Sequence, residues 1–315
     1  METTTLAPTI VPPEEAAPAA QAPQAPSQAA ASAAAVELPT TYIRPASGWQ
    51  LVNVRELWQY RELLFFLTWR DVKVRYKQTL LGAAWAILQP VMMMIVFTIF
   101  FSRLAKVSSG DVPYPLFAFA GLLPWTFFST AIANAGNSVV GSERLITKIY
   151  FPRLAVPLAT VGAAVVDFAI ALGVLLVMMV FYRMRGAPVH FGPGLLLAPF
   201  IFGIIALCAT GVGTLLAALN VSYRDFRYVI PFLVQLWLFA TPTVYMQPFN
   251  GPGSKMQIVI LLNPLAGLIG SFRGAMLGSP IPWAHLAIAA ASSFAIFVLG
   301  CLYFRKVEDT FADII

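Results

Sequence analysis

A dense basic cluster runs directly into a long apolar stretch between Arg70 and Phe101. No residue from Leu80 to Phe101 is ionisable. A helix of that length rises about 33 Å, which is enough to cross the hydrocarbon core of a bilayer. Basic residues gather at the cytoplasmic ends of membrane spans, and four of them precede this stretch: Arg70, Lys73, Arg75 and Lys77. The junction therefore predicts a transmembrane helix that starts at the cytoplasmic side.

Composition extends this prediction to the rest of the chain. Of its 315 residues, 59% are hydrophobic and only 11% are charged, whereas a soluble domain carries roughly 25% charged residues. We therefore expect an all-α polytopic membrane protein. The net charge of +6 comes from Lys and Arg that flank apolar stretches, so we expect contact with anionic membrane lipids and no nucleic-acid partner. Cys208 and Cys301 fall inside predicted spans and are expected to pack there.

The pattern divides the chain into four segments. Residues 1–40 are rich in Ala and Pro and predict a disordered cytoplasmic tail, because they carry too little apolar surface to fold. Residues 41–79 predict a cytoplasmic linker and an amphipathic helix with apolar residues at helical spacing: Leu57, Tyr60, Leu64 and Leu67. This helix lies either in the membrane interface or against the protein's own spans, and the pattern leaves both open. Residues 80–304 are the membrane domain, and residues 305–315 are a cytoplasmic tail.

Six transmembrane helices are predicted in the membrane domain: 80–101, 116–140, 156–182, 194–219, 229–246 and 283–304. The second is expected to be interrupted at Leu123-Pro124-Trp125. Asn263-Pro264 breaks the stretch 247–282, which predicts two short re-entrant helices between spans five and six and not a seventh span. The cytoplasmic loops are then 141–157 and 220–228. With both termini also cytoplasmic, most Lys and Arg lie on the cytoplasmic side, as the positive-inside rule requires.

The chain shows no pattern for catalysis. It has no Gly-rich loop ending in Gly-Lys-Ser/Thr, so we do not expect it to hydrolyse ATP. His190 and His285 have no ligand partner at metal-binding spacing, and we expect neither a metal nor a cofactor in the chain. Asp167 is the one acidic residue inside a predicted span. Because no other span offers an ionisable group as a relay partner, Asp167 predicts a structural hydrogen bond to a neighbouring helix and not a transport role.

Five segments between Leu57 and Asp309 occur in a specific order: LLGAAWAILQPV, ERLITKIYFPR, NVSYRDFRYV, ATPTVYM and LLNPLAGLI. Together they resemble the membrane subunit of type-2 ABC exporters for polysaccharides, namely O-antigen, capsule and teichoic acid. The resemblance implies a permease in the bacterial cytoplasmic (inner) membrane that works as a homodimer with two copies of a separate ABC ATPase subunit. That partner would bind ATP and Mg. The substrate would be a lipid-linked polysaccharide.

The resemblance also implies roles for particular residues. The loop after the second span would insert into the ATPase, with three candidates for coupling: Glu143, Arg144 and Lys148. The loop after the fourth span would form a second contact through Tyr223, Arg224 and Asp225. Arg70 and Asp71 would mark the turn from the interface helix into the first span. For each of these charges, plain interfacial solvation is the alternative.

A passage for glycans should offer aromatic rings, because sugars present apolar C–H faces with hydroxyls around the edge. Four residues are candidates for a channel lining: Trp125, Phe128, Trp237 and Tyr245. Three alternatives stay open. An ABC exporter of teichoic acid or of a drug would have the same layout. A secondary transporter would need more buried ionisable groups than Asp167. A membrane enzyme acting on polyprenyl-linked sugars would need side chains that bind diphosphate and metal.

Overall fold

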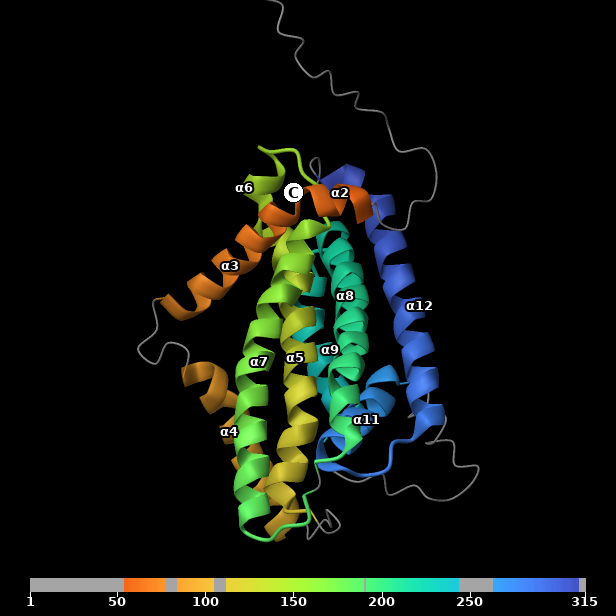
Figure 1. The fold of residues 1–315 in the computed structure, drawn as a ribbon. Helices are drawn as coiled ribbons and strands as arrows, with labels where there is room; N and C mark the ends of the chain where they lie inside the picture. The colour runs from red at the N-terminus through yellow and green to blue at the C-terminus, as the bar shows by residue number, and fades with distance from the viewer. Residues whose placement is uncertain (1–53, 78–83, 105–111, 190, 244–262, 312–315) are drawn as a thin grey trace, which may run out of the picture. The chain divides into compact units, whose positions relative to one another are not determined.

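The computed structural model describes residues 54–77, 84–104, 112–189, 191–243 and 263–311. The chain divides into two units, Met1–Ser47 and Gly48–Ile315, and every described residue belongs to the second. Within these residues all regular structure is helical (Figure 1). The predicted all-α class is therefore confirmed for the described part of the chain. The predicted N-terminal tail, residues 1–40, lies outside it.

Four helices in the described part are long and apolar enough to cross a membrane. They are α5 (Tyr114–Gly141), α7 (Ala155–Met184), α8 (Ala198–Ser222) with the 3₁₀ turn Pro193–Leu197 before it, and α12 (Trp283–Val307), which the 3₁₀ turn Glu308–Thr310 follows. Two apolar helices are shorter: α4 (Ala84–Phe97), which continues as a π-helix over Thr98–Leu104, and α9 (Phe226–Ala240). The predicted first and fifth spans reach beyond the described residues, so a total of six spans stays a prediction.

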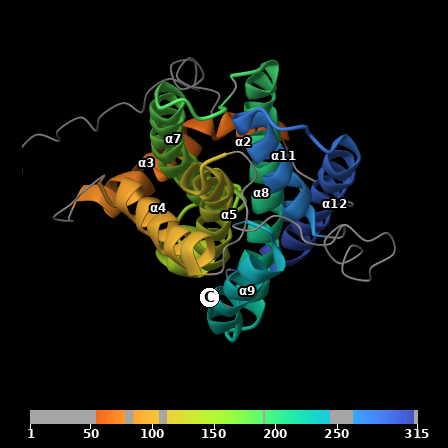
Figure 2. The same ribbon diagram turned by 90° about the horizontal axis from the view of Figure 1, so that it is seen from below.

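Helix α5 is central and contacts α4, α7, α8, α9 and α11 (Pro264–Leu277), as Figure 2 shows. Small residues allow the close approach of α8. A Cβ atom on Gly213 of α8 would lie 2.7 Å from the Cβ of Ala135 on α5. Lipid tails are as apolar as leucine, so burying apolar surface drives helices together only weakly in a bilayer, and close packing has to stabilise them.

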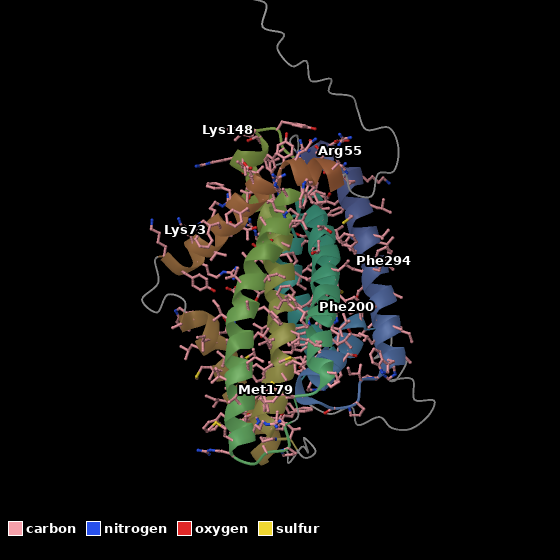
Figure 3. The ribbon with its side chains drawn as sticks, viewed as in Figure 1. Arg55, Lys73, Lys148, Met179, Phe200 and Phe294 are labelled. Atoms are coloured by element: carbon pink, nitrogen blue, oxygen red, sulfur yellow. The ribbon has the colours of Figure 1, made fainter. Side chains whose placement is uncertain are left out.

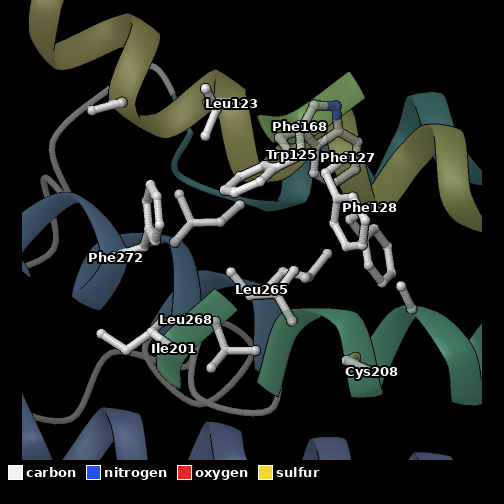
Figure 4. Packing of buried hydrophobic residues seen from close by; sticks show 14 of the residues in the cluster. Leu123, Trp125, Phe127, Phe128, Phe168, Ile201, Cys208, Leu265, Leu268 and Phe272 are labelled. Carbon is white, nitrogen blue, oxygen red and sulfur yellow. The ribbon is translucent and has the colours of Figure 1, made fainter. Parts of the chain in front are cut away.

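Aromatic rings fill the core between α5, α7, α8 and α11 (Figure 4). Phe168 of α7 stacks on Phe202 of α8 with ring centroids 3.8 Å apart, and Phe127 of α5 meets Phe202 edge-on at 4.8 Å. Phe272 of α11 meets Phe168 edge-on at 6.0 Å. Such pairs contribute about 1 kcal/mol each beyond the area they bury. The four helices are therefore held by one continuous set of ring contacts.

Helices α8 and α12 approach each other through two glycines. A Cβ atom on Gly300 would collide with the carbonyl oxygen of Gly211, and a Cβ on Gly211 would lie 2.5 Å from the Cα of Phe297. Only residues without a side chain allow two helix backbones to come this close.

The second span is not interrupted, against the sequence prediction. Helix α5 continues through Leu123-Pro124-Trp125 as one helix of 28 residues. A proline inside a helix removes one backbone hydrogen bond. Here Pro124 is buried together with most of the surrounding turns, so the neighbouring helices hold α5 on both sides of the missing bond.

The second cytoplasmic loop is shorter than predicted. Helix α8 continues to Ser222 and α9 begins at Phe226, so only Tyr223–Asp225 lies between them. Asn220, expected in the loop, is buried on α8, where its Nδ2 donates a hydrogen bond to the carbonyl oxygen of Gly136 at 2.8 Å. A polar side chain with such a partner can stay in a buried helix.

One of the two short helices predicted within 247–282 is present as α11. It begins at the Asn263-Pro264 break, where Asn263 Oδ1 accepts a hydrogen bond from the Leu265 N–H at 3.1 Å. Gly278 ends it with φ at 74°, a conformation that favours glycine. With 14 residues, α11 is too short to span a bilayer. The other predicted helix falls on residues 247–262, which lie outside the described part.

The predicted interface helix consists of α2 (Val54–Gln59) and α3 (Arg61–Lys77). Helix α3 lies along α7, where Leu67 is buried and a Cβ on Gly162 would lie 3.1 Å from Thr68 Oγ1. The structure thus shows the alternative in which the helix packs against the protein's own spans. Four aromatic side chains stay exposed, and their place in a membrane interface remains a prediction: Trp58, Phe65, Phe66 and Trp69.

Candidate functional site

The first candidate coupling segment lies between α5 and α7 and contains the short helix α6 (Glu143–Ile146). Glu143, Arg144 and Lys148 are exposed, whereas Ile146 is only 6% exposed. Figure 3 shows Lys148 at the same end of the helices as Arg55, while the labelled phenylalanines and methionine lie further along the long helices. The segment therefore exposes charged side chains on the protein surface, while the buried Ile146 anchors its short helix.

A small apolar cluster, called the α6 cluster below, supports this segment. Its main members come from α5, α6, the turn after α6, α8, α12 and the residues that follow α12: Val139, Ile146, Phe151, Leu154, Val221, Phe304 and Phe311. Phe304 and Phe311 meet edge-on with centroids 5.2 Å apart. Arg305 pairs with Glu308 at 2.5 Å beside them. Packed side chains transmit strain, so a displacement of α6 would reach several helices at once.

The second candidate segment is the turn Tyr223–Asp225, whose three side chains are exposed. The buried Asn220 lies just before it and donates hydrogen bonds to the Gly136 carbonyl oxygen and, at 3.2 Å, to Asn137 Oδ1. Gly136 and Asn137 belong to the last turns of α5, from which α6 follows. The two segments therefore lie at the same end of the helices. The buried amide of Asn220 joins α8, which precedes the second segment, to α5, which precedes the first.

Two exposed residues beside the first segment are not among the residues predicted from the sequence. Ile149 is 58% exposed and Tyr150 is 74% exposed, directly after Lys148. Clustered large apolar side chains on a polar surface are typical of a site that another molecule covers. The signal in the sequence is an Ile-Tyr-Phe run inside a charged loop, but only the structure separates the two exposed residues from the buried Phe151.

Arg70 and Asp71 do not lie at a turn, against the sequence prediction. Helix α3 continues beyond them to Lys77. Arg70 donates from Nε and Nη2 to Oδ1 of its neighbour Asp71, at 3.0 and 2.9 Å. No Gly or Pro occurs between Arg61 and Lys77, so nothing local ends the helix at the predicted junction.

Three of the four aromatic candidates for a channel lining lie next to one another. The ring centroids of Trp125 and Phe128 on α5 are 6.1 Å apart, and Phe128 meets Trp237 of α9 edge-on at 5.1 Å. Trp237 Nε1 also donates to Asn263 Oδ1 at 3.0 Å. Trp125 is 4% exposed and Phe128 is 0% exposed, so both rings are core residues of the single chain. Tyr245 lies outside the described residues.

Asp167 pairs with side chains of α3. Its carboxylate accepts a hydrogen bond from the Tyr76 hydroxyl and forms an ion pair with Arg75. Burial raises the pKa of the Tyr76 phenol above its ordinary value and outweighs the opposite effect of Arg75, so the phenol stays protonated and can donate. The predicted hydrogen bond between Asp167 and a neighbouring helix is confirmed, with Tyr76 of α3 as the donor. In the described part of the chain, no three His, Cys, Asp or Glu side chains are grouped to hold a metal ion.

A family match decides the class of this protein. Residues 62–277, from the start of α3 to the last residue of α11, match the model of the ABC-2 type transporter. The chain belongs to this family. The long apolar helices described above are thus those of a membrane component of a transporter.

Named relatives are similar over most of the chain. The O-antigen export system permease protein RfbA of Myxococcus xanthus is 31% identical over 259 residues, which are 81% of this chain and 96% of the relative. RfbA of Klebsiella pneumoniae is 26% identical over 81% of this chain and 95% of its own length. The polysialic acid transport protein KpsM of Escherichia coli is 22% identical over 76% of this chain and 91% of its own length. The resemblance to ABC exporter membrane subunits is confirmed.

Proposed function

We propose that this chain is the permease subunit of an ABC exporter that moves a lipid-linked polysaccharide across the bacterial cytoplasmic membrane. The observation that carries the proposal is its similarity to an O-antigen permease along 96% of that relative's length. The similarity to a polysialic acid transport protein favours an O-antigen-like or capsule-like glycan over a drug. Teichoic acid remains an alternative substrate.

Six spans with both termini in the cytoplasm fit this function. Helices α4, with the π-helix that continues it, and α9 would be the first and fifth spans, since they are apolar and expose large side chains over much of their surface: Met92, Phe100, Phe232, Leu236 and Phe239. Apolar helices with such faces need lipid or protein around them. Helix α11, buried and too short to cross, would be one of the re-entrant helices. The exposed aromatics of α3 would lie at headgroup depth.

Two copies of the chain would enclose the passage. The outward apolar faces of α4 and α9 are the surfaces that a second copy can cover. Trp125, Phe128, Trp237 and Tyr245 are proposed to line the passage. Because Trp237 covers Phe128 in the single chain, exposing these rings to a glycan requires α9 to move away from α5.

Two copies of a separate ABC ATPase would supply the energy, with ATP and Mg bound to them. The chain has no phosphate-binding loop of its own. Glu143, Arg144 and Lys148 would contact the ATPase together with the exposed Ile149 and Tyr150, and the turn Tyr223–Asp225 would form the second contact. A push on α6 would pass through the α6 cluster to α5, α8 and α12. Asp167 is engaged by Arg75 and Tyr76, which disfavours a secondary transporter that relies on it.

The proposal is tested by purifying tagged protein from its native membrane in a mild detergent. We expect an ABC ATPase subunit to copurify in equal amount and the complex to hydrolyse ATP. The double charge reversal Glu143→Lys with Arg144→Glu should release the ATPase and abolish surface glycan, with the protein still present in the membrane. Arg185→Glu, an exposed charge reversal at the opposite end of α7, should retain the partner. A chain that purifies alone and shows no ATP hydrolysis would refute the proposal.

A further inference from the structure

A cavity of about 440 Å³ lies between α3, α4, α5 and α7. Small-molecule sites typically measure roughly 300–1,000 Å³. Its walls carry aromatic rings and neutral polar groups, among them Tyr76, Trp85, Phe127, Gln89, Thr130 and Asn134. The mixture differs from the purely apolar core beside it, where Phe168 and Phe202 stack.

Two amides in this cavity are available to a ligand. The side chains of Gln89 and Asn134 make no hydrogen bond to any residue that the structure describes. Each amide offers two N–H donors and one carbonyl acceptor. In a helix that crosses a membrane such groups need a polar partner, and a bound polar molecule would provide one.

The cavity carries no net charge. Arg75 and Asp167, the charged side chains that line it, form an ion pair with each other. A phosphate would need a free cation, and an ammonium group would need a free carboxylate. The lining instead combines amides and threonine hydroxyls with aromatic rings. This combination suits a neutral sugar, whose hydroxyls pair with amides while its C–H faces lie on rings.

We propose that this cavity binds one neutral sugar unit of the transported glycan. The inference rests on the proposed function and adds a site to it. Thr126, Thr130 and Asn134 recur at a spacing of four on one face of α5, whereas Phe128 meets Trp237 of α9 from another face. The sugar site therefore does not include Phe128 or Trp237, two of the aromatic candidates for the channel lining.

The binding test uses the full chain in lipid nanodiscs free of glycoside detergent. The probes are the methyl glycosides of mannose, galactose and N-acetylglucosamine, detected by saturation-transfer NMR. We expect at least one to bind. Asn134→Leu and Gln89→Leu should each weaken that binding about tenfold, the effect of losing a good hydrogen bond. The matched control Gln235→Leu, an exposed amide on α9, should bind as the unchanged chain does. Absence of binding by all three sugars, or their displacement by inorganic pyrophosphate, would overturn the assignment.

A second measurement does not depend on apolar variants that could fail to fold. Cys208 and Cys301 are both buried, so a maleimide should report selectively on the single variant Thr130→Cys. The sugar that binds should slow this labelling about tenfold at a saturating concentration, and unchanged labelling would contradict the site.

The two proposals fail in distinguishable ways. If deleting the chain leaves the surface glycan intact, the proposed function is wrong whatever the binding result. If deletion removes the surface glycan but no sugar protects Thr130→Cys, only the sugar site is wrong.

Discussion

The ion pair between Asp167 and Arg75 joins a helix of the membrane domain to α3, and 91 residues separate Tyr76, the second partner, from Asp167 in the sequence. The two charged side chains are 24% and 31% exposed, so both have lost most of their water. Removing one partner leaves the other charge partly buried and unpaired, which costs more than the pair itself contributes. Asp167 is thus paired with side chains that lie outside the predicted spans.

This pairing predicts a non-additive effect of substitution. Asp167→Leu and Arg75→Met should each lower the free energy of unfolding by about 1–2 kcal/mol, whereas the double variant should lose less than the sum, with a coupling of about 1 kcal/mol. Thermal unfolding in detergent measures all three. Asp71→Asn, which removes an exposed pair with the adjacent Arg70, is the control and should change stability by less than about 0.5 kcal/mol. Additive losses would show that Asp167 and Arg75 do not interact.

At the scale of elements, the crossing of α8 and α12 depends on backbone contact. Gly211 and Gly300 face each other, and each lacks the space for a Cβ atom. In a bilayer the two helices gain little from burying apolar surface. The contact therefore depends on how closely their backbones approach. A single added methyl group would increase the distance between them.

We predict that Gly211→Ala and Gly300→Ala each destabilise the protein by about 1–3 kcal/mol, the usual cost of overpacking. Gly203 lies on the same helix α8, and a Cβ atom added there would meet nothing within 4 Å. Gly203→Ala should therefore be neutral or stabilising by up to about 1 kcal/mol, because alanine favours the helix. Thermal unfolding in detergent distinguishes these outcomes. Equal stability of all three variants would mean that α8 and α12 do not cross at these glycines.

For the whole molecule, we propose a direction of the spans from the charges at their ends. Lys148 lies at the end that carries α2 and α6, whereas Met184 ends α7 at the other end and is 82% exposed (Figures 1 and 3). The positive-inside rule assigns the first end to the cytoplasm. This orientation would give the proposed ATPase partner access to α6 from the cytoplasm.

Two variants, each with one added cysteine, test this orientation. Lys148→Cys should react with a membrane-impermeant maleimide only in inside-out vesicles, and Met184→Cys only in intact spheroplasts. The native cysteines are buried and should react little with the maleimide. Labelling of the unchanged protein measures this background. Labelling of both variants from the same side would contradict a transmembrane α7, and the reverse pattern would invert the topology.

The sequence by itself determined the all-α class of the described residues, the long helices α5, α7 and α12 nearly to their ends, and the family. These follow from local properties, because a chain in lipid must satisfy its backbone within each helix and therefore needs long apolar stretches. The charged loop at Glu143 was identified for the same reason, since charges cannot lie inside such stretches.

Only the tertiary structure decided which side chains meet. Pro124 stays within a continuous helix because its neighbours are packed, and Asn220 leaves the predicted loop because it donates a hydrogen bond to the Gly136 carbonyl oxygen. Trp125 packs in the core of the single chain. The cavity between α3 and α7 likewise joins residues that are far apart along the chain. Contacts of this kind depend on how helices cross, and that crossing is set by the shapes of all the side chains together.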